Sequence, residues 1–131
     1  FPISSNTVNA VTEAMYGVVN DGGTAAASQI KGIQFCGKTG SAQVISDQTH
    51  VRTGAGKQYQ DNAWFVGFAP RQNPQIVVSV LVQGGKEGAL AAAPIAKDIV
   101  QAYFQEQTQR QPQYTEKASR PAMETAQVGN H

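Results

Sequence analysis

The sequence predicts an α+β fold, in which three antiparallel strands lie between a preceding helix and a C-terminal helix packed on the sheet. Apolar patterns of helical and strand type follow one another in the order helix, strand, strand, strand, helix. A short turn at residues 71–75 separates the last two strands, which should therefore form an antiparallel hairpin. The first two strands should also be antiparallel, across a longer loop.

The first helix is expected at about residues 6–20. Its valines and methionine recur at roughly helical spacing: Val8, Val11, Met15, Val18 and Val19. Ser4, Ser5 or Asn6 can cap its start, and the glycine pair 22–23 should end it. A loop or short extended link follows.

The three strands are expected at about 33–45, 63–70 and 76–83. The middle one is apolar at nearly every position, which is typical of a strand buried on both faces, and the last is rich in β-branched residues. The first two are joined by a polar, glycine-containing connector, residues 46–61. Connectors of this length often lie near a functional site.

The second helix is expected at about residues 91–106, with Pro94 near its first turn, where a missing N–H costs little. Residues 108–131 contain few apolar side chains and no periodicity, so they are predicted to be a disordered tail. The structured segment should thus span 1–107. Its single C-terminal helix can cover one sheet face at most. The other face and one edge should meet partner segments, a second copy or an exchanged strand.

Composition excludes several classes of function. The formal net charge of +1 argues against a nucleic-acid or anionic-membrane surface. One cysteine and two scattered histidines make neither an internal disulfide nor a metal site, and no cofactor is expected. No run approaches the roughly 18 apolar residues of a membrane span. The abrupt start at "FPISSN" suggests a fragment of a longer protein.

The most informative stretch is "GKTGSA", residues 37–42, because lysine and glycine are poor strand residues. A lysine on an inner strand can hold a carboxylate and lower the pKa of a neighbouring hydroxyl. Thr39 and Ser41 offer hydroxyl donors, while Gly40 leaves room for a substrate against the strand edge. The simpler alternative is an edge strand whose lysine faces solvent.

The surrounding blocks extend this motif: "AMYGVVNDGGTAAA", "GKTGSAQV", "DNAWFVGFAP", "PQIVVSVLVQGG" and "AAAPIAKDIVQAYF" occur in that order. Over residues 1–104 this succession resembles the C-terminal part of the transpeptidase domain of class B penicillin-binding proteins, and most of all penicillin-binding protein 2, the cell-elongation type. Lys-Thr-Gly is one of three motifs of such serine acyltransferases, beside Ser-x-x-Lys and Ser-x-Asn. The resemblance implies part of the penicillin-binding and serine β-lactamase-like fold.

The resemblance also implies a reaction and its residues. A serine attacks the terminal D-Ala-D-Ala of a peptidoglycan stem peptide, D-Ala leaves, and an amine of a second stem resolves the acyl-enzyme. Lys38 would contact the Ser-x-Asn serine, and Thr39 and Ser41 would bind the carboxylate of substrate or β-lactam. The Ser41 N–H would complete the oxyanion hole, and Gly40 belongs to the same binding strand. The family more often has threonine at position 41.

Two strings imitate the missing motifs. "SQIK" (28–31) fits Ser-x-x-Lys and "SSN" (4–6) fits Ser-x-Asn, but they occur in the wrong order for the family. Ser28 has no identifiable base or desolvated pocket, so it is interpreted as a decoy. "SSN" is explained by helix capping. The chain is therefore expected to lack its nucleophile and to be inactive alone.

Other residues carry weaker hypotheses. Trp64 and Phe65 are expected in the core or the wall of a cleft, and His50 and Arg52 could line a substrate groove.

A D,D-carboxypeptidase or serine β-lactamase fragment is an alternative, as is a non-catalytic β-lactam sensor or interaction module. The implied partners are the rest of the transpeptidase domain and, by family analogy, a membrane glycosyltransferase. The parent protein would be extracytoplasmic, or periplasmic, and anchored by an absent N-terminal helix.

Overall fold

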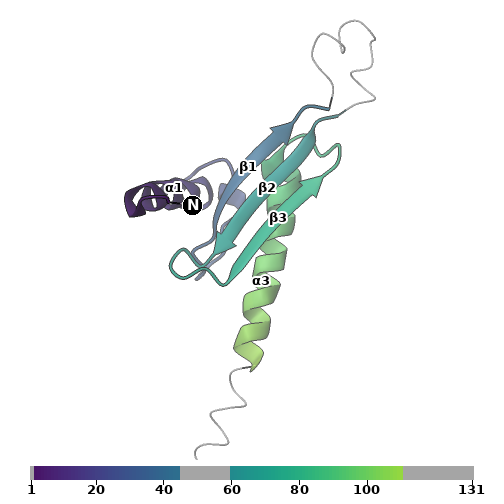
Figure 1. Cartoon of the computed structure of the whole chain (residues 1–131). Coiled ribbons are helices and arrows are strands. Elements are labelled where there is room, and N and C mark those ends of the chain that lie inside the picture. Colours follow the sequence, from purple (N-terminus) through teal and green to yellow (C-terminus); the bar gives the residue numbers. More distant parts are fainter. Residues whose placement is uncertain (1, 45–59, 111–131) are drawn as a thin grey trace, which may run out of the picture.

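A computed structural model of the chain describes residues 2–44 and 60–110. Its elements are, in order, α1 (Ser5–Asn20), η1 (Ala26–Ser28), β1 (Cys36–Ala42), β2 (Asn62–Ala69), β3 (Ile76–Val82), η3 (Gly88–Ala92) and α3 (Ala93–Arg110). The strands form one sheet in the order β1-β2-β3, and both pairs are antiparallel (Figure 1). The predicted α+β fold, with a helix before the sheet and another packed on it, is confirmed.

Several element ends differ from the expected ones. β1 is shorter than 33–45, because the chain first makes a tight turn in which the Phe35 N–H donates to the Ile33 carbonyl at 2.9 Å. A π-helical turn, η3, precedes α3, which begins at residue 93. α3 also continues to Arg110, beyond the expected start of the tail at 108. The rest of the tail, 111–131, and connector residues 46–59 lie outside the described residues.

Both ends of α1 are fixed by side-chain hydrogen bonds. Ser4 caps the N-terminal end, since its Oγ accepts from the Thr7 N–H at 3.1 Å. The Asn20 side chain donates to the Phe35 carbonyl at 2.8 Å, and Gly22 adopts a positive φ of 74° that lets the chain turn away from the helix. The 24–32 link, expected as a loop, contains the short η1 helix.

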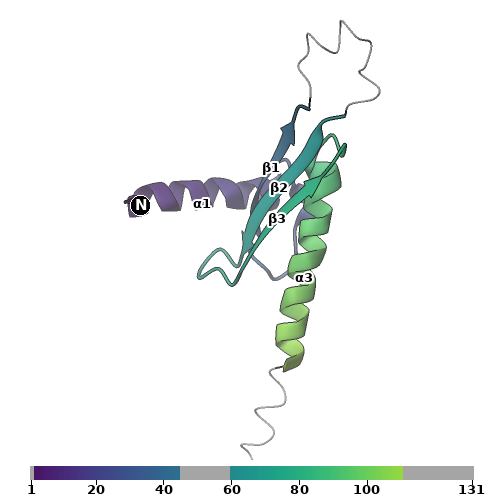
Figure 2. The ribbon, with the colours of Figure 1, turned by 45° about the vertical axis from the view of Figure 1, so that its right-hand side comes forward.

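The core lies between the sheet and α3, which packs on one face of the sheet against β2 and β3 (Figure 2). We call this the inner face. Phe65 of β2 is 0% exposed and packs against Phe35, with ring centroids 5.5 Å apart. A Cβ at Gly37 would lie 2.1 Å from the Phe65 ring, so glycine there makes room for the aromatic core.

The opposite, outer face of the sheet is largely uncovered. Its exposed apolar side chains are Trp64, Val66, Val77 and Leu81. Val77 is the most open of them, at 78% exposure. Figure 2 shows α1 projecting away from the β1 side and leaving most of this face open. The expectation that one face would lack cover is thus confirmed for the part of the chain that the structure describes.

Candidate functional site

The candidate site is β1, the edge strand that carries all four of the predicted site residues in succession. Lys38 pairs with Val66, and Gly40 pairs with Trp64. Because side chains alternate along a strand, Lys38 and Gly40 belong to the outer face, and Thr39 and Ser41 belong to the opposite side. The lysine therefore shares its face with the exposed apolar side chains of β2 and β3.

The Lys38 side chain folds back over its own strand. It is exposed, and its Nζ donates to the Thr39 carbonyl. In an antiparallel edge strand, alternate residues direct their N–H and C=O toward the same edge. Thr39 and Ser41, two residues apart, therefore direct their backbone N–H and C=O groups toward the same side of β1.

Thr39 makes a contact that its sequence context does not predict. Its Oγ1 lies 2.8 Å from the Oγ1 of Thr24, in the turn after α1. The 24–32 link was expected only as a loop or an extended connection, so nothing pointed to this hydroxyl. The only local signal is that Thr24 directly follows the glycine pair that ends α1.

Gly88 makes a second unanticipated contact, at the beginning of η3. A Cβ at this position would lie 2.2 Å from the Trp64 carbonyl oxygen and 2.7 Å from the Gly40 carbonyl oxygen. The backbone of η3 therefore touches β1 and β2 directly at the level of Gly40. The site strand is thus supported from its inner side at the glycine of the Lys-Thr-Gly motif.

The two imitating strings do not contribute to this site. Ser4 is the helix cap, as expected. Ser28, the last residue of η1, is 1% exposed, so the expectation that it lacks a desolvated environment was wrong. Its Oγ nevertheless has no hydrogen-bond partner among the described residues, and Lys31 is exposed. A serine without a base is a poor nucleophile.

The two aromatic candidates, Trp64 and Phe65, lie on opposite faces of the sheet. Phe65 is in the core, whereas the neighbouring Trp64 is 39% exposed on the outer face. Cys36, two residues before Lys38, is fully buried, and burial raises the pKa of its thiol, opposed in part by the positive charge of Arg71. The thiol therefore stays protonated near neutral pH and is not an activated nucleophile. His50 and Arg52 lie outside the described residues.

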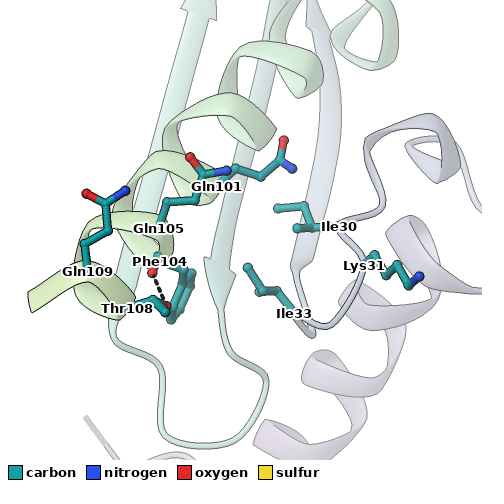
Figure 3. Close-up of a pocket in the computed structure, with 8 residues that line it drawn as sticks. All are labelled: Ile30, Lys31, Ile33, Gln101, Phe104, Gln105, Thr108 and Gln109. Carbon is teal, nitrogen blue, oxygen red and sulfur yellow. Dashed lines mark hydrogen bonds between the residues drawn. The ribbon is translucent and has the colours of Figure 1, made fainter. Parts of the chain in front are cut away.

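A groove of about 510 Å³ lies elsewhere, between the C-terminal half of α3 and the turn at 30–33 (Figure 3). Ile30 and Ile33 line one side of the groove, and Phe104 and glutamine side chains of α3 line the other. None of its lining residues belongs to β1. The groove is therefore separate from the candidate site.

Within residues 2–44 and 60–110, no three side chains of the His, Cys, Asp and Glu types are grouped so that they could hold a metal ion. In the same ranges, neither helix combines the length and the apolar character needed to cross a membrane.

Comparison with known proteins gives consistent matches. The sequence profile of the penicillin binding protein transpeptidase domain matches residues 1–101. A peptidoglycan D,D-transpeptidase MrdA of Haemophilus influenzae is 35% identical over 109 residues, which cover 79% of this chain and 16% of that protein. The chain thus spans about a sixth of this relative's length.

Two solved structures share the fold. The imipenem acyl-enzyme complex of penicillin-binding protein A from Mycobacterium tuberculosis is 30% identical, with a TM-score of 0.59, and the match covers 78% of this chain and 20% of that one. The penicillin-binding protein (PBP2) in complex with MreC from Helicobacter pylori is 25% identical, with a TM-score of 0.61, and the match covers 79% and 19%.

Proposed function

The chain belongs to the penicillin-binding protein transpeptidase family, and from this we propose that it is the C-terminal part of a peptidoglycan D,D-transpeptidase. The parent protein, by which we mean the longer protein that would carry this chain, cross-links stem peptides through a serine acyl-enzyme and is acylated by β-lactams. The nucleophilic serine comes from outside this chain, so the chain alone is inactive.

The observation that carries the proposal is the position of Lys38 on the face of the sheet that the described chain leaves largely uncovered. A lysine beside an apolar surface is well placed to meet groups contributed by a further layer of structure. In our proposal that layer is the rest of the transpeptidase domain. It packs on Trp64, Val66 and Leu81 and brings the nucleophile and the Ser-x-Asn serine to Lys38.

The edge of β1 supplies the remaining contacts. The Thr39 and Ser41 hydroxyls bind the carboxylate of the terminal D-Ala or of a β-lactam, because hydrogen bonds to an ionised acceptor are about twice as strong as neutral ones. The Ser41 N–H stabilises the oxyanion of the tetrahedral intermediate. Gly40 has no side chain, so a substrate can lie along the strand next to Trp64. Serine at 41 keeps the hydroxyl of threonine with looser rotamer control.

The parent protein is extracytoplasmic and anchored in the cytoplasmic membrane by a helix that precedes this chain. The relative from Helicobacter pylori forms a complex with MreC. By analogy, the parent protein belongs to a cell-elongation assembly that includes a membrane glycosyltransferase.

Labelling with a fluorescent penicillin tests the proposal. The parent protein should be labelled stoichiometrically and the 131-residue chain should not be labelled. Replacing the serine of the upstream Ser-x-x-Lys motif by alanine should abolish labelling of the parent. Labelling of the isolated chain at Ser28 would contradict the assignment of the nucleophile. A parent that lacks the upstream serine would instead favour a non-catalytic β-lactam sensor. A labelled parent that releases D-Ala without cross-linking would favour a D,D-carboxypeptidase.

A further inference from the structure

We propose that Thr24 is a positioning residue for carboxylate recognition: it fixes the hydroxyl of Thr39 so that this hydroxyl donates its proton to the bound carboxylate. This inference rests on the proposed function and extends it to a residue outside the Lys-Thr-Gly motif. The two Oγ1 atoms are 2.8 Å apart, the usual separation of a hydroxyl–hydroxyl hydrogen bond.

The turn that carries Thr24 is closely fixed against α1. The N–H of Gly23 donates to the Gly17 carbonyl, and the N–H of Ala25 donates to the Val18 carbonyl at 3.0 Å. A Cβ at Gly23 would lie 2.5 Å from the Val18 Cα, so the turn is in direct backbone contact with the helix. Ala25 on its other side is buried in the core. Thr24 is therefore held from both flanks.

The direction of the hydrogen bond follows from what a carboxylate can accept. In the unliganded chain either hydroxyl can be the donor. An ionised carboxylate only accepts, so Thr39 must use its single proton to bind it. The Thr39 oxygen can then only accept from Thr24. The two hydroxyls form a chain from Thr24 through Thr39 to the carboxylate, and each bond polarises the next.

The test is the acylation of the parent protein by two compounds, benzylpenicillin and its methyl ester, which lacks the ionised carboxylate. Thr24→Val keeps the shape of the side chain and removes the hydroxyl. It should slow acylation by benzylpenicillin about fivefold, as expected for one lost hydrogen bond, and leave the ester within about twofold. Thr24→Ser should restore the rate. Thr108→Val, on the far half of α3, is the matched control and should change neither rate.

The outcomes separate the two proposals. If the unaltered parent is not acylated, the proposed function fails, and this inference fails with it. If the parent is acylated but Thr24→Val slows both compounds equally, or slows neither, only the positioning role of Thr24 is refuted. Should the valine variant not fold, Thr24→Ala provides the same comparison, with folding checked by circular dichroism.

Discussion

The two faces of the sheet are built from the same three strands but differ in almost every physical respect. The inner face is closed by α3 and contains Phe65, Ala69, Val78 and Val80, which are all buried. The outer face contains equally apolar residues, with Trp64, Val77 and Leu81 among them, that remain exposed. Only the outer face carries a charged site residue, Lys38. A closed core and a largely uncovered surface that carries the candidate lysine thus lie on opposite faces of one sheet.

The difference arises because successive side chains of one strand point to opposite faces of the sheet. Phe65 and Trp64 are neighbours in β2, yet one is 0% exposed and the other 39% exposed. On the inner face, glycines at positions 37 and 67 allow the aromatic rings to approach the backbone closely. On the outer face, Gly40 has no such ring over it; a Cβ there would meet only the Trp64 Cβ, at 3.5 Å. Burial of the inner-face side chains stabilises the fold, whereas the outer-face side chains remain exposed.

The largest effect that would test this comparison is the loss of an inner-face ring. Phe65→Ala should lower the free energy of unfolding by about 3–5 kcal/mol, because a core phenylalanine loses its transfer free energy and leaves a cavity. Trp64→Ala, one residue away, should cost about 1–2 kcal/mol, because much of that side chain is already exposed. Chemical denaturation of the 131-residue chain provides both values.

If Phe65→Ala does not fold, Phe65→Leu should still be the more destabilised member of the pair when compared with Trp64→Leu. Equal losses at the two positions would contradict the comparison. They would mean that the outer face is covered in solution as well.

A smaller effect concerns the support of the site strand by η3. Gly88→Ala should destabilise the chain by about 1–3 kcal/mol, because the new Cβ would overlap the carbonyl oxygens of Trp64 and Gly40 and force η3 away from the strands. Gly17→Ala is the matched control. Its Cβ would meet only the Asp21 carboxylate, at 3.8 Å. It should stabilise the chain by about 0.5–1 kcal/mol through helix propensity.

Thermal unfolding of the two glycine variants should therefore shift in opposite directions. A Gly88→Ala variant as stable as the unaltered chain would show that η3 does not press on β1.

The smallest effect on stability is expected at the outer face. Val77→Lys and Leu81→Lys should leave the stability of the monomer within about 0.5 kcal/mol, as is usual for surface substitutions. They should, however, reduce self-association of the chain, because each breaks the exposed apolar surface. Sedimentation velocity over a range of concentrations measures this. Ala102→Lys adds the same charge on α3 and should not alter association. A strictly monomeric unaltered chain would contradict the expected self-association.

Much of the fold was accessible from local patterns. Helical spacing indicated the two helices, apolar and β-branched runs indicated strands, and the short 71–75 turn indicated an antiparallel hairpin. The ends of the elements were harder to predict. Nothing local distinguishes the end of α3 near 108, where the Thr108 hydroxyl donates to the Phe104 carbonyl and the helix continues to Arg110. The π-helical turn at 88–92 depends on packing against the strands, which local propensity does not contain.

The candidate site could be proposed from the sequence because its residues lie in one continuous strand. Lys38 to Ser41 are adjacent in sequence, so a single motif indicated them. Thr24 and Gly88 reach the same strand from two distant turns, and only the tertiary structure brings them there. Ser28 illustrates the reverse: its string fits a nucleophile motif, but its side chain is buried and its Oγ has no hydrogen-bond partner among the described residues.

The connectivity of the sheet also has a consequence for the order in which it assembles. The link between β2 and β3 covers only residues 70–75, whereas the link between β1 and β2 covers 43–61. Loop-closure entropy grows with the logarithm of loop length, and the longer link costs about 1 kcal/mol more to close. We therefore expect the β2–β3 hairpin to form first and β1 to join it later. By the same reasoning β1 is the strand most readily detached, and its amide hydrogens should exchange earliest in the sheet.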